Sequence, residues 1–179
     1  SVPDVHPGKF WDNDTPPSEG NTYVGMVVRD NESWEGISQR LQVPLTTGKC
    51  YKFTIDLARS NKYMSAKRLT SAPHNYIQPT VFRLWGGSGM CNDRELLAES
   101  KAVDHADWRT YQFKVKPKAD CKFILIEAFY KTPIIEPYCG HILVDNLSDF
   151  DEMDCNTALQ PVVMKNAVAA PKEKLPPHK

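Results

Sequence analysis

The clearest strand pattern in the sequence is CYKFTIDLA at residues 50–58. Apolar side chains alternate with polar ones along it, with Tyr51, Phe53, Ile55 and Leu57 on one side and Lys52, Thr54 and Asp56 on the other. Successive side chains of a β-strand point to opposite faces, so this pattern separates an apolar face from a polar one. The stretch is therefore predicted to be a strand with one face in a core.

Seven further runs have the composition of strands. They are TYVGMVVR (22–29), WEGISQRLQV (34–43), TVFRLWG (80–86), ELLAES (95–100), WRTYQFKVK (108–116), KFILIEAFY (122–130) and HILVDNL (141–147). Turn-forming stretches such as PLTTGK and KPKADC separate them. The run 122–130 is apolar on both faces, as expected of a central strand. The pattern predicts an all-β protein, an antiparallel β-sandwich with the jelly-roll arrangement of about eight strands.

Length and composition limit the classes of function. The chain has 179 residues, 41% of them hydrophobic, and equal numbers of basic and acidic residues, 22 of each. That content supports one domain with a core, and the balanced charge argues against nucleic-acid binding. We expect no transmembrane segment, because no apolar run approaches the length of a bilayer. Residues 1–153 are predicted to form the jelly-roll domain, and the Pro-, Ala- and Lys-rich residues 154–179 a linker or tail within a longer chain or assembly.

Several motifs occur in a recognisable order. They are EGNTYVGMVVRDN, WEGISQRLQVPLTTGKCYKFTIDLARS, FRLWGG, DWRTYQFKV, EAFYKTP and GHILVDNLSDF. Together they resemble the galactose-binding-like jelly rolls of carbohydrate-binding modules, in the version found in Gram-negative envelope proteins, often ahead of an OmpA-like domain. The resemblance implies a non-catalytic carbohydrate-binding module that is periplasmic, outer-membrane-associated or on the cell surface, with a glycan or an envelope protein as its partner. The alternative is an interaction or structural domain of an envelope assembly with no sugar ligand.

One departure from this family concerns the N-terminus. Such domains usually open with a strand of the type Asn-x-x-Phe-Glu, which this sequence lacks. We expect that first strand to be missing or built differently.

The candidate ligand-binding residues come from three strands that a jelly roll would place in one sheet. Their outward side chains are predicted to combine two or three aromatic rings with arginine and glutamate: Trp34, Arg40, Arg83, Trp85, Glu127 and Phe129. Flat rings can cover the C–H faces of a sugar while polar groups pair with its hydroxyls. The alternative is that both tryptophans belong to the core and that the charged residues form ordinary cross-strand pairs. Tyr63 and Tyr76, in the long loop 59–79, are predicted to wall the same face, unless the loop packs on itself.

A metal is implied only by the resemblance. Relatives hold a structural calcium partly through the aspartate of the last strand, which is Asp145 here. The alternative is that Asp145 accepts backbone N–H groups or pairs with a buried arginine.

The five cysteines leave their pairing open. In a jelly roll Cys91 and Cys121 fall at one end of the sandwich, so a disulfide between them is predicted; the alternative is that all five are reduced. No histidine spacing suits a metal, and no nucleophile elbow or phosphate loop is present in the sequence. Glu35 and Glu127 are the conceivable carboxylates of a glycosidase, but we expect no enzymatic activity.

Overall fold

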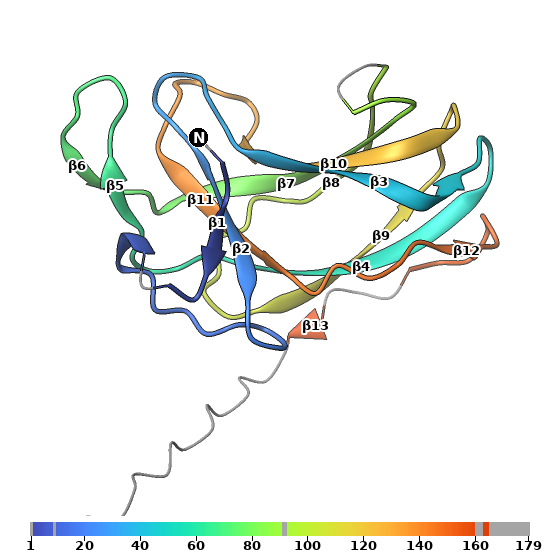
Figure 1. The fold of residues 1–179 in the computed structure, drawn as a ribbon, viewed down its shortest axis with the longest axis horizontal. Coiled ribbons are helices and arrows are strands. Elements are labelled where there is room, and N and C mark those ends of the chain that lie inside the picture. The colour runs from blue at the N-terminus through green and yellow to red at the C-terminus, as the bar shows by residue number, and fades with distance from the viewer. Residues whose placement is uncertain (1, 9, 91–92, 160–162, 165–179) are drawn as a thin grey trace, which may run out of the picture.

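The protein folds as a sandwich of two β-sheets (Figure 1). The computed structural model describes residues 2–8, 10–90, 93–159 and 163–164. The first sheet is built around β2 (Tyr23–Val28), β11 (Gly140–Asp145), β4 (Cys50–Ala58) and β9 (Arg109–Val115), in that spatial order. The second sheet has the order β3 (Gly36–Leu45), β10 (Cys121–Tyr130), β7 (Gln78–Gly87) and β8 (Glu95–Glu99).

The chain crosses repeatedly between the two sheets, which is the jelly-roll path. It runs from β2 to β3 and back to β4, then through β7 and β8 to β9, and finally through β10 to β11. Neighbours within each sheet are antiparallel. A short parallel contact between β11 and β7, at Gly140 and His141, joins the sheets. The predicted all-β sandwich is confirmed, and each of the eight predicted runs overlaps one of these strands.

The remaining elements are short. They are β1 (Asp4–His6), which pairs with β2; the turn η1 (Phe10–Asp12); the hairpin of β5 (Met64–Ala66) and β6 (Pro73–Asn75); β12 (Asp151–Met153), which pairs with β4; and β13 (Val163–Met164), which pairs with β9. The N-terminal edge of the first sheet is thus a three-residue antiparallel strand. Within the described ranges, no helix is long and apolar enough to cross a membrane.

Two apolar clusters stabilise the fold. The alternating side chains of β4 enter the core between the sheets, where Phe53, Ile55 and Leu57 are at most 1% exposed. The second cluster covers the outer side of the first sheet and contains Tyr23, Val27, Ala58, Tyr63, Tyr76, Trp108, Cys139 and Leu143. The segment after β4 contributes Tyr63 and Tyr76 to this cover. The N-terminal segment adds to it, because His6 stacks on Tyr23 and the Pro16 carbonyl accepts a hydrogen bond from Trp108.

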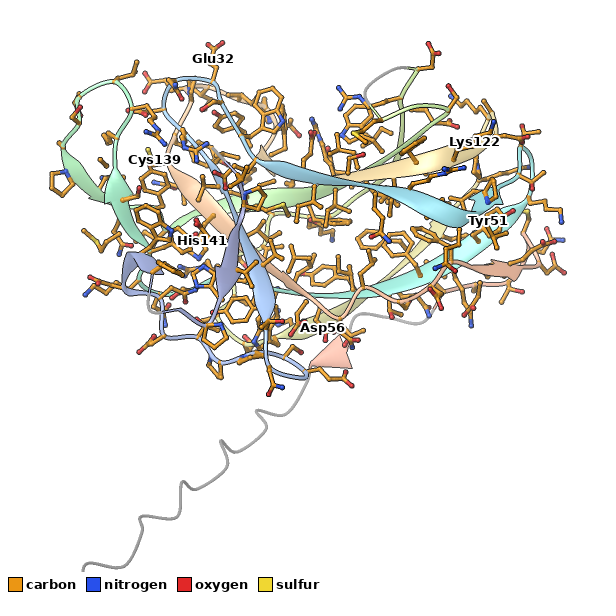
Figure 2. The ribbon with its side chains drawn as sticks, viewed as in Figure 1. Glu32, Tyr51, Asp56, Lys122, Cys139 and His141 are labelled. Atoms are coloured by element: carbon orange, nitrogen blue, oxygen red, sulfur yellow. A yellow bond between two sulfur atoms is a disulfide. The ribbon has the colours of Figure 1, made fainter. Side chains whose placement is uncertain are left out.

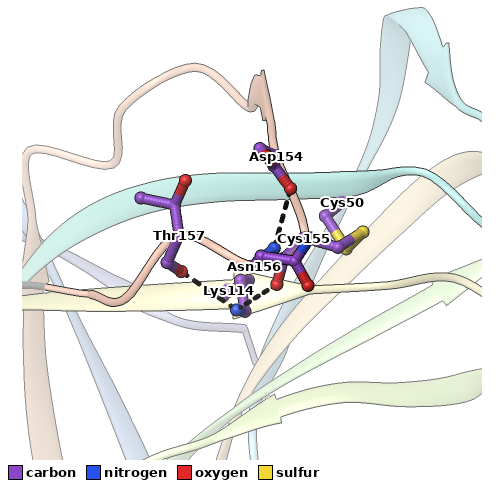
Figure 3. The surroundings of a disulfide bond; sticks show 6 residues. All are labelled: Cys50, Lys114, Asp154, Cys155, Asn156 and Thr157. Carbon is purple, nitrogen blue, oxygen red and sulfur yellow. Dashed lines mark hydrogen bonds between the residues drawn. A yellow bond between two sulfur atoms is a disulfide. The ribbon is translucent and has the colours of Figure 1, made fainter.

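The disulfide joins Cys50 to Cys155, a separation of 105 residues (Figure 3). Cys50 begins β4 and is paired in register with Met153 of β12, which brings the two cysteine Cα atoms to 5.2 Å. Cys121 is a buried free thiol, so the predicted Cys91–Cys121 bond is wrong. Cys91 itself lies outside the described residues. The error arose because sharing one end of a sandwich does not give two residues disulfide geometry.

Candidate functional site

The outer face of the second sheet collects the residues predicted from three separate strands. Glu127 of β10 is paired with Gly36 of β3 on one side and with Arg83 of β7 on the other. Residues paired across neighbouring strands point to the same face of a sheet. Trp34, just before β3, bridges to Val28 and completes the group at the edge of the sheet.

Glu127 is the centre of this group. The residue is only 6% exposed, and both of its carboxylate oxygens accept hydrogen bonds within the protein. The indole Nε1 of Trp34 donates to Oε2 at 3.0 Å, and that of Trp85 donates to Oε1 at 2.8 Å. A carboxylate has about four acceptor positions, so two remain beyond those taken by the indoles. The hydrogen bonds fix the orientation of both tryptophan rings relative to one carboxylate.

A row of side chains in contact with one another runs across the same face. The ring of Trp34 packs edge-on against Phe129, with centroids 4.9 Å apart and planes at 81°. The guanidinium carbon of Arg83 lies 3.6 Å from the Phe129 centroid, and its Nε donates to Glu99 Oε2 at 2.5 Å. The stacking and the ion pair together hold the Arg83 guanidinium over the ring of Phe129. The row therefore combines the exposed ring of Trp34 with charged groups whose positions are set.

Exposure decides between the two interpretations of the tryptophans. Trp34 is 42% exposed, and Trp85 is half-buried. Neither ring is therefore a core residue, and both reach solvent on this face. The pair Arg83–Glu99 is the ordinary cross-strand ion pair that the alternative foresaw, although with Glu99 rather than Glu127 as the acid.

Arg40 lies apart from this group. It is exposed and paired in register with Phe123, four residues along β10 from Glu127. At the strand rise of about 3.3 Å per residue, this corresponds to roughly 13 Å. Arg40 shares the outer face but is separated from the indole pair.

Tyr63 and Tyr76 do not line the face, so this prediction is wrong. Both are 1% exposed and belong to the cluster on the outer side of the first sheet. The ring of Tyr63 stacks on His141 with centroids 4.4 Å apart, and the hydroxyl of Tyr76 donates to the Ala66 carbonyl at 2.6 Å. The loop packs on the protein through its tyrosines, because large rings stabilise most when they are buried.

The sequence interpretation missed two charged residues at this face, Glu99 and Arg94. Glu99 is the in-register partner of Arg83, and the Arg94 guanidinium carbon lies 5.7 Å from the Trp85 centroid. Glu99 is the last residue of β8 and Arg94 immediately precedes this strand, which the sequence predicted. Finding them required the register of β8 against β7, which includes an irregularity between Leu84 and Trp85.

Asp145 accepts backbone amides, as the alternative foresaw. Its Oδ2 accepts from the N–H groups of Ser18 at 2.8 Å and Glu19 at 3.0 Å, and its Oδ1 from that of Asn146 at 2.8 Å. A calcium ion needs several oxygen ligands around it. The groups around the Asp145 carboxylate are amide hydrogens, which carry partial positive charge and would repel the ion. No group of three or more His, Cys, Asp or Glu side chains suits a metal within the described part of the chain. The donor set around Asp145 therefore does not fit the calcium that the resemblance implies.

Two other buried ionisable groups have structural partners. His141, fully buried on the outer side of the first sheet (Figure 2), accepts from Ser60 N at 2.7 Å through Nε2 and lies 2.6 Å from the Tyr76 carbonyl through Nδ1. Burial lowers the pKa of His141 to about 4, so the ring is neutral and donates through Nδ1. Glu35 forms a buried ion pair with Arg29 and accepts from the Val27 N–H at 3.2 Å. Its carboxylate thus links β2 to the start of β3.

Comparisons with known proteins give weak likenesses. No family model and no curated protein matches the chain. A solved structure described as "CBM4 structure and function" is 10% identical, with a TM-score of 0.46 over 73% of this chain and 84% of that one. The CBM22-1–GH10 modules of the Clostridium thermocellum xylanase 10B, complexed with xylohexaose, are 14% identical, with a TM-score of 0.48 over 89% of this chain. This chain matches 26% of the length of that xylanase fragment. With TM-scores below 0.5, neither likeness decides the function.

Proposed function

We propose that the protein is a non-catalytic carbohydrate-binding-type module of a bacterial cell-envelope or surface protein. The observation that carries the proposal is the pair of indoles, Trp34 and Trp85, held by the single buried carboxylate of Glu127 on an open sheet face.

The chemistry of this face suits a sugar. Pyranose rings present C–H groups that pack on flat aromatic surfaces, and hydroxyls that need fixed donors and acceptors. Trp34 and the half-buried Trp85 supply ring surface, and Arg83 supplies a guanidinium held by stacking on Phe129. Because hydrogen bonds to Glu127 already orient the indoles, binding would immobilise few additional side-chain rotations.

The envelope location is supported by the cysteines. A disulfide such as Cys50–Cys155 forms and persists in oxidising compartments and is rare in the cytosol. We therefore infer a periplasmic, outer-membrane-associated or cell-surface location.

The non-catalytic part of the proposal rests on how the carboxylates are used. Glycosidases place two carboxyl groups on either side of the scissile bond. Glu127 orients two indoles, and Glu35 is engaged in its buried pair with Arg29. Incubation with the glycans that bind should accordingly release no reducing sugar.

The test is retention on insoluble cellulose, xylan, chitin and peptidoglycan, together with a glycan array. We expect retention on at least one glycan and a loss of affinity of tenfold or more for Trp34→Ala and Trp85→Ala. Arg40→Ala is the matched control, because Arg40 lies on the same face away from Glu127 and should stay within twofold of wild type. Equal losses in all three variants, or no retention on any glycan, would refute the proposal.

An interaction domain without a sugar ligand is the second candidate. It is favoured by two adjacent apolar side chains in the segment after β10, Ile134 and Ile135, which are 42% and 92% exposed. Such a pair at a surface is typical of protein contacts. Absence of glycan binding in the retention experiment would favour this candidate.

A further inference from the structure

A second pair of exposed aromatic rings lies far from the sheet face described above. Phe10 and Trp11 of η1 are 54% and 40% exposed. Figure 1 shows η1 beside β5 and next to β1, at the first sheet rather than at the layer of β3, β7, β8 and β10. We call Phe10 and Trp11 the η1 platform.

Both rings of the η1 platform have fixed orientations. Trp11 Nε1 donates to Asp4 Oδ2 at 2.7 Å, and its ring lies nearly parallel to that of Tyr63, at 21° with centroids 6.5 Å apart. Phe10 packs on Gly8, where an added Cβ would come within 2.2 Å of its ring. Its other neighbour, His6, meets it edge-on at 6.4 Å. The rings are therefore positioned before any ligand arrives.

The backbone at this point is unfavourable for Trp11. Trp11 and Asp12 have φ values of 59° and 55°, in the left-handed region, which aspartate tolerates but a bulky residue such as tryptophan rarely adopts. A tryptophan that filled the core could offset this cost by burial, but Trp11 leaves two-fifths of its surface in solvent. Strain of this kind concentrates at functional sites, where the surrounding contacts enforce it.

Polar groups flank the rings. Asp12 and Lys62 form an ion pair at 2.8 Å, and both side chains are 58% exposed. Because Asp4 already occupies the indole N–H of Trp11, this ring offers a ligand its face and C–H edge. A flat apolar ring next to a carboxylate and an ammonium group matches the C–H face and hydroxyls of a sugar.

We propose that the η1 platform is a second carbohydrate-contact surface, on which Trp11 stacks a pyranose ring while Asp12 and Lys62 bind its hydroxyls. The choice of ligand class rests on the proposed function, whereas the residues are independent of the sheet face. The inference makes the module bivalent, with two contact surfaces on different layers of the sandwich.

The four tryptophans of the chain allow each surface to be followed separately. The probe is a ¹⁵N NMR titration of the indole N–H signals with cellohexaose, xylohexaose and chitohexaose. We expect the Trp11 signal to shift and saturate with at least one of them. Trp108 is the internal control and should stay in place, because it is 9% exposed and donates to the Pro16 carbonyl at 2.8 Å.

Two variants sharpen the test. Trp11→Ala should remove the Trp11 signal and leave the titration midpoints of Trp34 and Trp85 within twofold of wild type. Lys62→Ala, which leaves both rings in place, should raise the midpoint of Trp11 at least threefold. An unchanged Trp11 midpoint in Lys62→Ala would overturn the assigned role of Lys62 and with it the proposal.

The outcomes separate the two proposals. Shifts of Trp34 and Trp85 with a stationary Trp11 overturn the η1 platform and leave the proposed function standing. A shift of Trp11 alone supports the platform and counts against the sheet face. Stationary signals with all three probes, or a Trp108 shift as large as that of Trp11, overturn the platform as a sugar site.

Discussion

The buried ring of His141 should make the stability of this protein strongly dependent on pH. His141 is 0% exposed, and burial lowers its pKa from 6.5 to about 4. Between pH 6.5 and pH 4 the unfolded chain binds a proton at this residue that the folded chain does not, so the free energy of unfolding falls as the pH falls. Each pH unit of that interval costs about 1.4 kcal/mol, so His141 alone should remove about 3 kcal/mol between pH 7 and pH 4.

The assay is urea unfolding at a series of pH values, for wild type and for His141→Gln. The variant cannot take up the proton, so its free energy of unfolding should fall less across this range, by about the 3 kcal/mol assigned to His141. His74→Gln is the matched control, because His74 is only half-buried in β6, and it should keep the wild-type slope. The same pH slope for wild type and His141→Gln would refute the reasoning. So would an NMR titration in which the His141 ring of the folded wild type becomes protonated near pH 6.5.

Four further predictions concern single contacts. Glu127→Gln should lower the free energy of unfolding in urea by about 1–3 kcal/mol. The amide has one oxygen acceptor, and its NH2 group cannot accept from the second indole N–H. An unchanged stability would argue against the double hydrogen bond. Reduction of the Cys50–Cys155 disulfide should lower the free energy of unfolding by about 2–5 kcal/mol, and a loss well below this range would contradict its contribution. Trp11→Gly should be about 1 kcal/mol more stable than Trp11→Ala, because glycine adopts a positive φ without steric cost; equal stabilities would contradict the left-handed backbone. Treatment with EGTA should leave the Tm unchanged, because backbone amides already donate to both oxygens of Asp145. A clear fall in the Tm would support a calcium site at Asp145.

The strands and their faces were predictable because they depend on local pattern. The alternation through Phe53 and Ile55 specified a strand with one buried face, and the observed strand has the bounds expected from the sequence. The outward orientation of Arg83 and Glu127 followed from the same period of two. The sequence therefore sufficed for the all-β class and for the set of strands that build the candidate site.

Contacts between distant segments depended on the tertiary structure. Which cysteine meets Cys50 follows from the pairing of β12 with β4, and no local pattern encodes that pairing. The burial of Tyr63 follows from the packing of its loop against the first sheet. Two of the three amides at Asp145 come from a segment 126 and 127 residues away in sequence.

The candidate site itself shows the same division. The sequence alone predicted which side chains share one side of each strand, because side-chain direction along a strand is a local property, but it left open whether the two tryptophans belong to the core. The binding of both indoles to one carboxylate became visible in the folded protein, because Trp34 and Trp85 lie 93 and 42 residues from Glu127 in sequence. Strand register is set by the packing of whole sheets, and that packing turned three separate side chains into one group.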